Sequence, residues 1–192
     1  MRLLTGTATV DDLDGAVADL ERTGERVDCT TQAFDAGLVA DTEHLRRAVV
    51  LADRARSRNE GIARKRAVEV LLYAAGRRQI DRALAMGLTE GTTAAVVLAH
   101  AEGSGTGSVE VHDRRPETDE VGTDDPDPPE ERERATLAAV CDLAWFEPGP
   151  VTLGDPERLR AFFDVDEAEL AATDAALADL VRERVALLVV DR

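Results

Sequence analysis

The sequence predicts a mixed α/β fold in a single domain over residues 1–192, with a small central sheet flanked by helices. Short apolar runs typical of strands alternate along the chain with segments of helical spacing. A length of 192 residues suits one sizeable core and is short for two domains. The longest uninterrupted apolar stretches, Ala94–Ala99 and Val185–Val190, fall far below the ~20 residues that a membrane span needs. We therefore expect no membrane association.

The first half of the chain provides most of the expected elements. Arg2–Thr9 is expected to be a strand, followed by a helix that Asp11 or Asp12 caps and that ends near Gly24. Val27–Phe34 is expected to be a second strand. Further helices are expected from Thr42 to about Arg58, from Arg64 to Gly76, and over a short segment ending at Gly87 that turns Ile80, Ala83 and Leu84 inward. Ala94–Ala101 reads as a buried strand.

The second half opens with an acidic, Pro/Gly-rich segment over residues 102–134, which we expect to be a flexible insertion within the domain. Its stretch Asp113–Arg134 holds ten acids, four arginines and four prolines, with almost nothing to bury. Helical patterning resumes over Thr136–Trp145. The remaining elements are expected to be a helix from Asp155-Pro156 to Phe163, a longer helix over Glu167–Arg182, and a closing strand over Arg184–Val190.

Charge is the most informative property of the composition. Asp and Glu total 39 against 23 Lys and Arg, a net charge of −16, and Lys65 is the single lysine. A composition rich in acids and nearly free of lysine is similar to that of proteins from salt-loving archaea. In those cells concentrated salt screens the repulsion between the carboxylates of one protein. The acidity is therefore interpreted as a property of the host, and not as a sign of a basic partner.

One segment departs from this acidity. His44–Arg82 contains ten arginines and one lysine against four acids, a net charge of +7. Basic residues concentrated in an acidic chain indicate an anionic partner, of which nucleic acid is the usual one. The alternative is a set of solvated arginines whose stems cover apolar neighbours. Arg64-Lys65-Arg66 favour the first interpretation, because they lie at an expected helix start, where the helix dipole disfavours cations.

No catalytic residues, metal ligands or cofactor site can be assembled from the sequence. The glycine-rich run at 103–108 has no helix directly after it to present N–H groups to a phosphate, so a linker is the better interpretation. The acidic run at 124–127 lacks the glycine and the final glutamate of a calcium loop. Cys29 and Cys141 form no CxxC pair, and we expect reduced thiols in a cytoplasmic protein.

The central segment resembles a known family. Glu69-x-Leu-Leu-x-x-x-Gly76, followed by Arg78-Gln79-Ile80 and a closing Gly87, is similar to the signature of the small subunit of the KEOPS complex, the PRPK-binding protein family. Flanking segments agree with that family in order, namely Gln32-x-Phe34-Asp35, His44-Leu45-x-x-Ala48, Phe163-x-Val165, Glu169-Leu170 and Glu183-x-Val185-Ala186-Leu187-Leu188. The resemblance covers most of the chain outside residues 102–134, and the composition is typical of an archaeal, halophile-like version.

The resemblance implies a non-catalytic subunit of a complex that installs threonylcarbamoyladenosine in tRNA. Such a subunit binds and stimulates the kinase-like ATPase subunit directly, meets the other KEOPS subunits indirectly, and captures the 3′ CCA end of tRNA. No cofactor is implied. The candidate tRNA-binding residues are Arg64, Lys65, Arg66, Tyr73, Arg77, Arg78 and Gln79.

These candidates have distinct expected roles. The cationic side chains would contact phosphates and Gln79 a base edge, while Tyr73 would either stack on a base or be buried. Ile80 is expected to be a core residue rather than a contact. The alternative function is a small acidic regulatory protein that binds only protein partners and no RNA.

Overall fold

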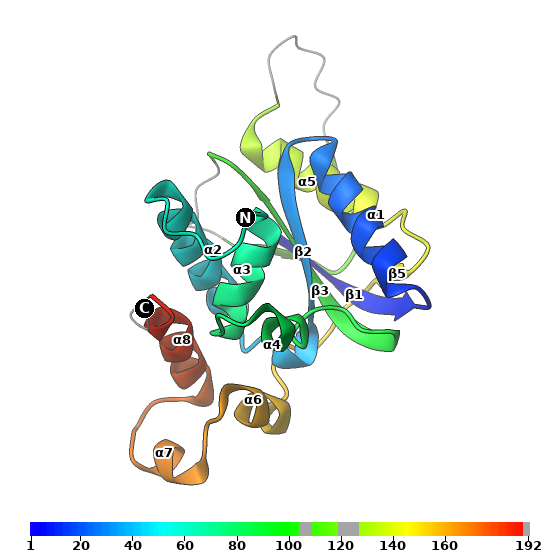
Figure 1. Ribbon diagram of the computed structural model, residues 1–192. Coiled ribbons are helices and arrows are strands. Elements are labelled where there is room, and N and C mark those ends of the chain that lie inside the picture. The colour runs from blue at the N-terminus through cyan, green and yellow to red at the C-terminus, as the bar shows by residue number, and fades with distance from the viewer. Residues whose placement is uncertain (104–108, 119–126, 190–192) are drawn as a thin grey trace. The chain divides into compact units, whose positions relative to one another are not determined.

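The computed structural model, drawn as a ribbon in Figure 1, describes residues 1–103, 109–118 and 127–189. The chain separates into two compact units. The sheet unit comprises Met1–Ala33 and Leu88–Val151, and the helical unit comprises Phe34–Gly87 and Thr152–Arg192. Strands and helices both contribute, so the mixed α/β class expected from the sequence is confirmed.

The sheet is organised around its first strand. β1 (Arg2–Val10) runs antiparallel to β3 (Gly91–Ala101) over its whole length, and β3 in turn neighbours β2 (Cys29–Asp35). On its other edge β1 pairs in parallel with β4 (Glu110–His112) and antiparallel with β5 (Phe146–Pro148). Three of the four strands expected from the sequence are confirmed, as β1, β2 and β3. The two extra strands have three residues each, which is too short for a period of two to be recognised.

Two helices belong to the sheet unit, α1 (Leu13–Glu25) and α5 (Pro129–Val140). Asp12 caps α1, because its carboxylate accepts a hydrogen bond from the Gly15 N–H at 3.1 Å. Apolar side chains of both helices and of the strands form one buried cluster, which includes Leu4, Ala8, Leu20, Val97, Leu137 and Phe146.

The expectation of a loop over Asp113–Arg134 is wrong at its C-terminal end, where α5 already begins at Pro129. Proline suits the first position of a helix, and the acids of the first turn complement the helix dipole. Glu133 is buried, and its carboxylate lies 3.2 Å from Nδ1 of His100 and accepts the Ala101 N–H at 3.1 Å. Residues 129–134 are therefore part of the folded unit; residues 104–108 and 119–126 of the expected insertion lie outside the described residues.

The helical unit contains the remaining elements. Its first half holds the 3-10 helix η1 (Ala36–Leu38), α2 (Thr42–Ser57), α3 (Arg66–Ala75) and α4 (Ile80–Leu84), close to the expected positions. Its second half holds α6 (Pro156–Phe163), α7 (Glu167–Ala171) and α8 (Leu177–Leu187). The buried apolar residues of the second half include Leu159, Phe163, Val165, Leu180 and Val181.

Two expectations for the C-terminal segment are wrong. The single helix expected over Glu167–Arg182 is interrupted, because Thr173 Oγ1 accepts the Ala175 N–H and the Asp179 carboxylate accepts the Ala176 N–H, which starts a new helix. The strand expected over Arg184–Val190 is instead the end of α8 as far as Leu187. A short continuous apolar run does not distinguish a buried strand from a buried helix end. Val190 lies outside the described residues.

α4 corrects a third expectation. Ala83 is fully buried, but Ile80 and Leu84 are 47% and 54% exposed. Helices of only five residues bury a narrow stripe, and positions 80 and 84 lie one turn apart on the same face. That face of α4 points to solvent within the helical unit.

His44 is the buried titratable side chain at the start of α2. Its Nε2 donates to the Ala74 carbonyl at 2.7 Å and its Nδ1 accepts the Ala40 N–H at 3.2 Å, so both ring nitrogens are occupied in the neutral ring. Burial is the main cause that lowers the pKa of His44 from 6.5 to about 4. The hydrogen bond to Ala74 opposes that shift only in part.

Acid should therefore destabilise the helical unit before the carboxylates titrate. Since the folded pKa is about 4 and the unfolded value is 6.5, the full stability is present above pH 6.5 and is lost progressively down to pH 4. At pH 5 this one group is expected to cost about 2 kcal/mol of unfolding free energy relative to pH 8. Denaturant melts at the two pH values would measure it. In a His44→Gln variant the loss between pH 8 and pH 5 should shrink, and an unchanged loss would contradict the assignment.

Candidate nucleic-acid interface

The basic segment of the sequence folds into α2, α3, α4 and the loops between them. α3 begins at Arg66 with Lys65 as its N-cap, which confirms that Arg64-Lys65-Arg66 lie at a helix start. α3 ends at Ala75 and is capped by Gly76, whose φ of +59° is a left-handed conformation that glycine adopts without strain. The expected residues therefore fall at the two ends of one ten-residue helix, about 15 Å apart.

The loop before α3 is fixed by a buried carboxylate. Glu69 is completely buried, and its side chain accepts the Ile62 N–H at 2.8 Å and the Ala63 N–H at 2.6 Å. From the other side, the Arg56 guanidinium of α2 donates to the Arg64 carbonyl at 3.2 Å. The loop therefore has both its N–H groups and its carbonyl groups held, and the side chains of Arg64 and Lys65 are displayed from a fixed backbone, exposed to solvent.

Two of the expected phosphate contacts are engaged inside the protein. Arg66 forms a two-point pair with Asp53, in which its Nε and Nη2 each lie 2.8 Å from a carboxylate oxygen. Arg77 donates to the Phe162 carbonyl at 2.5 Å and to the Asp164 carboxylate at 2.7 Å. Both side chains link segments of the helical unit, and each would have to leave its partner to bind a phosphate.

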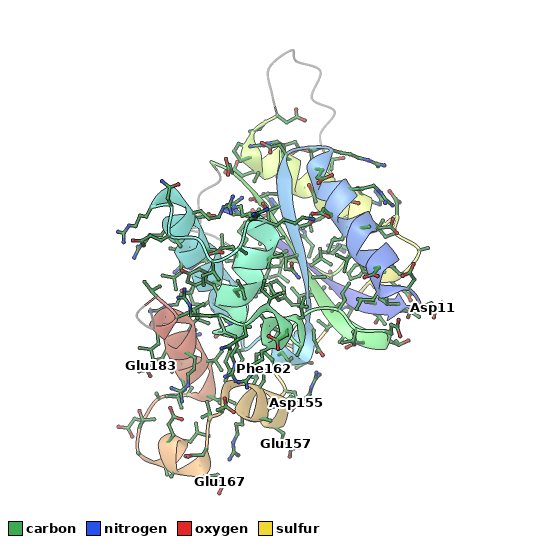
Figure 2. The ribbon with its side chains drawn as sticks, in the orientation of Figure 1. Asp11, Asp155, Glu157, Phe162, Glu167 and Glu183 are labelled. Atoms are coloured by element: carbon green, nitrogen blue, oxygen red, sulfur yellow. The ribbon has the colours of Figure 1, made fainter. Side chains whose placement is uncertain are left out.

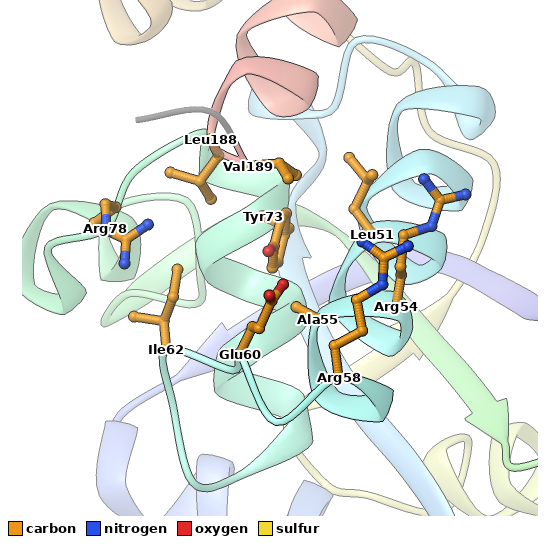
Figure 3. Close-up of a pocket in the computed structure, with 10 residues that line it drawn as sticks. All are labelled: Leu51, Arg54, Ala55, Arg58, Glu60, Ile62, Tyr73, Arg78, Leu188 and Val189. Atoms are coloured by element: carbon orange, nitrogen blue, oxygen red, sulfur yellow. The ribbon is translucent and has the colours of Figure 1, made fainter. Parts of the chain in front are cut away.

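The other candidates lie toward solvent or toward a cavity. Arg78 and Gln79 are exposed in the loop between α3 and α4, and Gln79 makes no side-chain hydrogen bond that caps α4. Tyr73 is only 3% exposed, which leaves little ring surface for a base to stack on. Tyr73 and Arg78 both line a cavity of about 310 Å³ in the helical unit (Figure 3).

Several residues of this region were not expected from the sequence to be contacts. Arg54 and Arg58 were counted in the basic segment but not singled out, although their spacing of four residues places them on one face at the end of α2. Ile80 was assigned to the core and is exposed directly after Gln79. An exposed apolar side chain beside cationic ones is a typical surface for an unstacked base.

The second half of the helical unit has a net negative charge, in contrast to the basic segment that forms α2–α4. Residues 152–189 contain nine acids and four arginines, and Figure 2 labels Asp155, Glu157, Glu167 and Glu183 among the acids. All four arginines face carboxylates, in the pairs Arg158–Asp35, Arg160–Glu167, Arg182–Asp41 and Arg184–Glu169. By contrast, Arg47, Arg54, Arg58, Arg64 and Arg82 of the basic segment have no carboxylate partner among the described residues. The uncompensated cations of this unit are thus concentrated in α2–α4.

Metal-ligand clusters and the environment of the two cysteines can be assessed in the described residues. No group of three or more His, Cys, Asp or Glu side chains that could hold a metal occurs in the ranges 1–103, 109–118 and 127–189. Both cysteines are free thiols, and burial raises the pKa of Cys29 to about 11, far from a nucleophilic thiolate at neutral pH. Over the same part of the chain, no helix has the length and apolar character needed to cross a membrane.

Replacing Glu69 with Gln should loosen the loop before α3. The amide offers one acceptor oxygen and turns an NH₂ group toward backbone N–H donors, so we expect a loss of about 1.5–3 kcal/mol. Amide hydrogen exchange at Ile62 and Ala63 should accelerate, and thermal unfolding should show the lower stability. Asp81→Asn, an exposed acid on α4, is the matched control. Unchanged exchange at both amides would show that the carboxylate does not hold this loop.

Comparison with known proteins identifies the family of the chain. No curated protein sequence matches the chain. The sequence profile of the family described as Kinase binding protein CGI-121 matches residues 12–188, which is nearly the whole chain. It is the family of the KEOPS subunit that the central motif resembles. The chain belongs to the Kinase binding protein CGI-121 family.

Proposed function

We propose that this protein is a non-catalytic, cytoplasmic subunit of the KEOPS complex, which modifies tRNA to threonylcarbamoyladenosine. In this role it binds and stimulates the kinase-like ATPase subunit directly and captures the 3′ CCA end of tRNA. Binding to a kinase partner follows from the family. The observation that carries the RNA part is the concentration of uncompensated, exposed arginines on α2–α4 in a chain of net charge −16.

The proposed RNA surface runs along α3 from its start to the beginning of α4. Arg64 and Lys65 at one end, and Arg78 at the other, would hold phosphates with charge-assisted hydrogen bonds. Gln79 supplies an amide for a base edge, and the exposed Ile80 next to it offers an apolar contact for a splayed base. The sequence expectation that Tyr73 stacks is the least supported part, since its ring is buried.

High salt should leave this mode of binding largely intact. At about 1 M salt the screening length is only about 3 Å, so long-range attraction contributes little. Directional arginine–phosphate hydrogen bonds and burial of a base persist, and arginine provides the planar fork that lysine lacks. This would suit a chain whose composition is typical of a halophile.

We predict that tRNA capture depends on the CCA end and on Arg64 and Arg78. In filter-binding or gel-shift assays at high salt, removing the terminal CCA should abolish binding, while Arg64→Ala and Arg78→Ala should each weaken it about tenfold or more. Arg78→Lys should not restore binding. Arg26→Ala, an exposed arginine of the sheet unit, should bind normally.

The result that would contradict RNA capture at a 3′ end is equal binding of trimmed and intact tRNA. The alternative function, a small acidic regulator that binds only protein, predicts no tRNA recovery by the single chain in a pull-down. The uncompensated arginines would then meet an acidic partner surface.

A second prediction concerns ATP hydrolysis by the chain alone and in the presence of the kinase-like subunit. The purified chain should show no ATP hydrolysis above background, since neither its sequence nor its described structure offers a nucleotide-hydrolysing centre. Adding it to the kinase-like subunit should raise the ATPase rate of that subunit in a coupled assay. Robust hydrolysis by the single chain after rigorous purification would overturn the non-catalytic assignment.

A further inference from the structure

One exposed hydroxyl group lies inside the basic segment. Ser57 is the last residue of α2 and the one serine in the ranges 1–103, 109–118 and 127–189. Its Oγ donates to the Arg54 carbonyl at 2.9 Å, on the solvent side of the final turn. The four residues from Ser57 to Glu60 are all exposed, so the hydroxyl can be reached from solvent. The proposed RNA surface does not include it.

Arginines surround this hydroxyl along the chain. Arg54 lies three residues before Ser57, Arg56 one residue before it and Arg58 one residue after it. A protein kinase whose peptide groove is lined with carboxylates would attract such a segment and fix its register, because complementary charge steers association. No carboxylate among the described residues lies within ion-pair distance of Arg54 or Arg58. Both guanidinium groups are therefore available to an acidic groove.

Other exposed hydroxyl groups of the described residues have different surroundings. Thr118 follows Arg114 and Arg115, but Glu117 and the acids after it give that stretch a net negative charge. Thr173 lies between α7 and α8 and has no basic residue within five positions on either side. The combination of an exposed hydroxyl with a net positive neighbourhood thus favours Ser57.

We propose that Ser57 is a phosphorylation site for an arginine-directed protein kinase, and that the phosphate weakens RNA capture. In the transfer, Ser57 Oγ forms a bond to the γ-phosphorus of ATP and the bond from that phosphorus to the departing ADP breaks. The hydroxyl proton passes to a carboxylate of the kinase. The effect on RNA rests on the proposed function, since it requires that α3 and the loop before it bind RNA.

The phosphate would find a cationic partner at the end of α2. It carries a charge of about −1.5 to −2 at pH 7. Arg54 lies one helical turn before Ser57, a spacing at which side chains are neighbours, so its guanidinium can pair with the phosphate. Asp53 lies four residues before Ser57 on the same side, but Arg66 already compensates its carboxylate with two hydrogen bonds of 2.8 Å. The phosphate is therefore not placed beside an uncompensated carboxylate.

Two effects of the phosphate oppose RNA capture. Negative charge at a helix C-terminus is disfavoured by the helix dipole, so the last turn of α2 should loosen. Arg56 of that turn donates to the Arg64 carbonyl at 3.2 Å and helps to fix the loop that presents Arg64 and Lys65. The added charge also repels RNA phosphates that approach this loop. Both effects lower the affinity for RNA.

The first test locates the phosphate. The full chain is incubated with Mg-ATP and the catalytic subunit of cAMP-dependent protein kinase as the arginine-directed enzyme, and the modified residue is mapped by mass spectrometry. Incorporation is expected at Ser57, with none at Thr173 and none in a Ser57→Ala variant. No incorporation, or equal incorporation in Ser57→Ala, would overturn the assignment.

Phosphorus-31 NMR of the modified protein tests the pairing with Arg54. The phosphate should titrate with a midpoint about half a unit or more below that of free phosphoserine, because a neighbouring guanidinium stabilises the dianion. Arg54→Gln should return the midpoint to the free value, whereas Arg47→Gln, an exposed arginine farther along α2, should not. A midpoint equal to that of free phosphoserine in the unmutated chain would contradict the pairing.

The last test compares tRNA capture by phosphorylated and unmodified protein. In gel-shift assays at about 0.1 M salt, where the screening length is about 10 Å, phosphorylation should weaken binding about tenfold. Ser57→Ala taken through the same kinase reaction should bind as the unmodified chain does. Equal affinity of the two forms would overturn the regulatory effect. If the unmodified chain binds no tRNA, the proposed function fails and the regulatory effect with it, whereas the mapped residue and the phosphorus titration still decide whether Ser57 is the acceptor.

Discussion

The Glu69 carboxylate determines how the basic part of this protein is presented. It is completely buried, it accepts two backbone N–H groups, and it lies on the helix that the presented loop precedes. A buried carboxylate without such donors would be costly, so the loop and the side chain require each other. The motif by which the sequence resembles its family begins at this residue, and the Glu69 side chain organises the backbone just before Arg64 and Lys65.

The arginines of the helical unit divide into two populations. Those that pair with carboxylates or donate to carbonyls, such as Arg66, Arg77 and Arg184, link different segments of the helical unit. Others, such as Arg47, Arg54 and Arg82, lie on α2 and α4 and have no carboxylate within ion-pair distance among the described residues. With 39 acids in the chain, most arginines are expected to find a carboxylate partner. Arginines that have none are therefore candidates for a functional role.

The fold class and most elements could be predicted from the sequence, and the wrong predictions fall where local sequence patterns are ambiguous. β1, β2, β3, α2 and α3 have clear periods or caps and were predicted close to their observed bounds. The C-terminal apolar run was assigned to a strand, because a buried helix end has the same composition. The start of α5 was missed because Pro129 and its neighbouring acids resemble a loop as much as a helix N-terminus. Of the candidate residues, the position of Arg64-Lys65-Arg66 at a helix start follows from the sequence. The pairing of Arg66 with Asp53 and the exposure of Ile80 depend on tertiary packing that no local pattern encodes.

The exposed position of Lys65 has a practical consequence. It is the single lysine of the chain, and it is the N-cap of α3, at one end of the proposed RNA surface. Amine-directed chemistry, whether a fluorescent ester, a crosslinker or an acetyl donor, will modify this one side chain besides any α-amino group. The natural sequence thus carries a built-in attachment point for reporter groups at the surface whose partner is in question, and no engineered cysteine or lysine is needed to place one there.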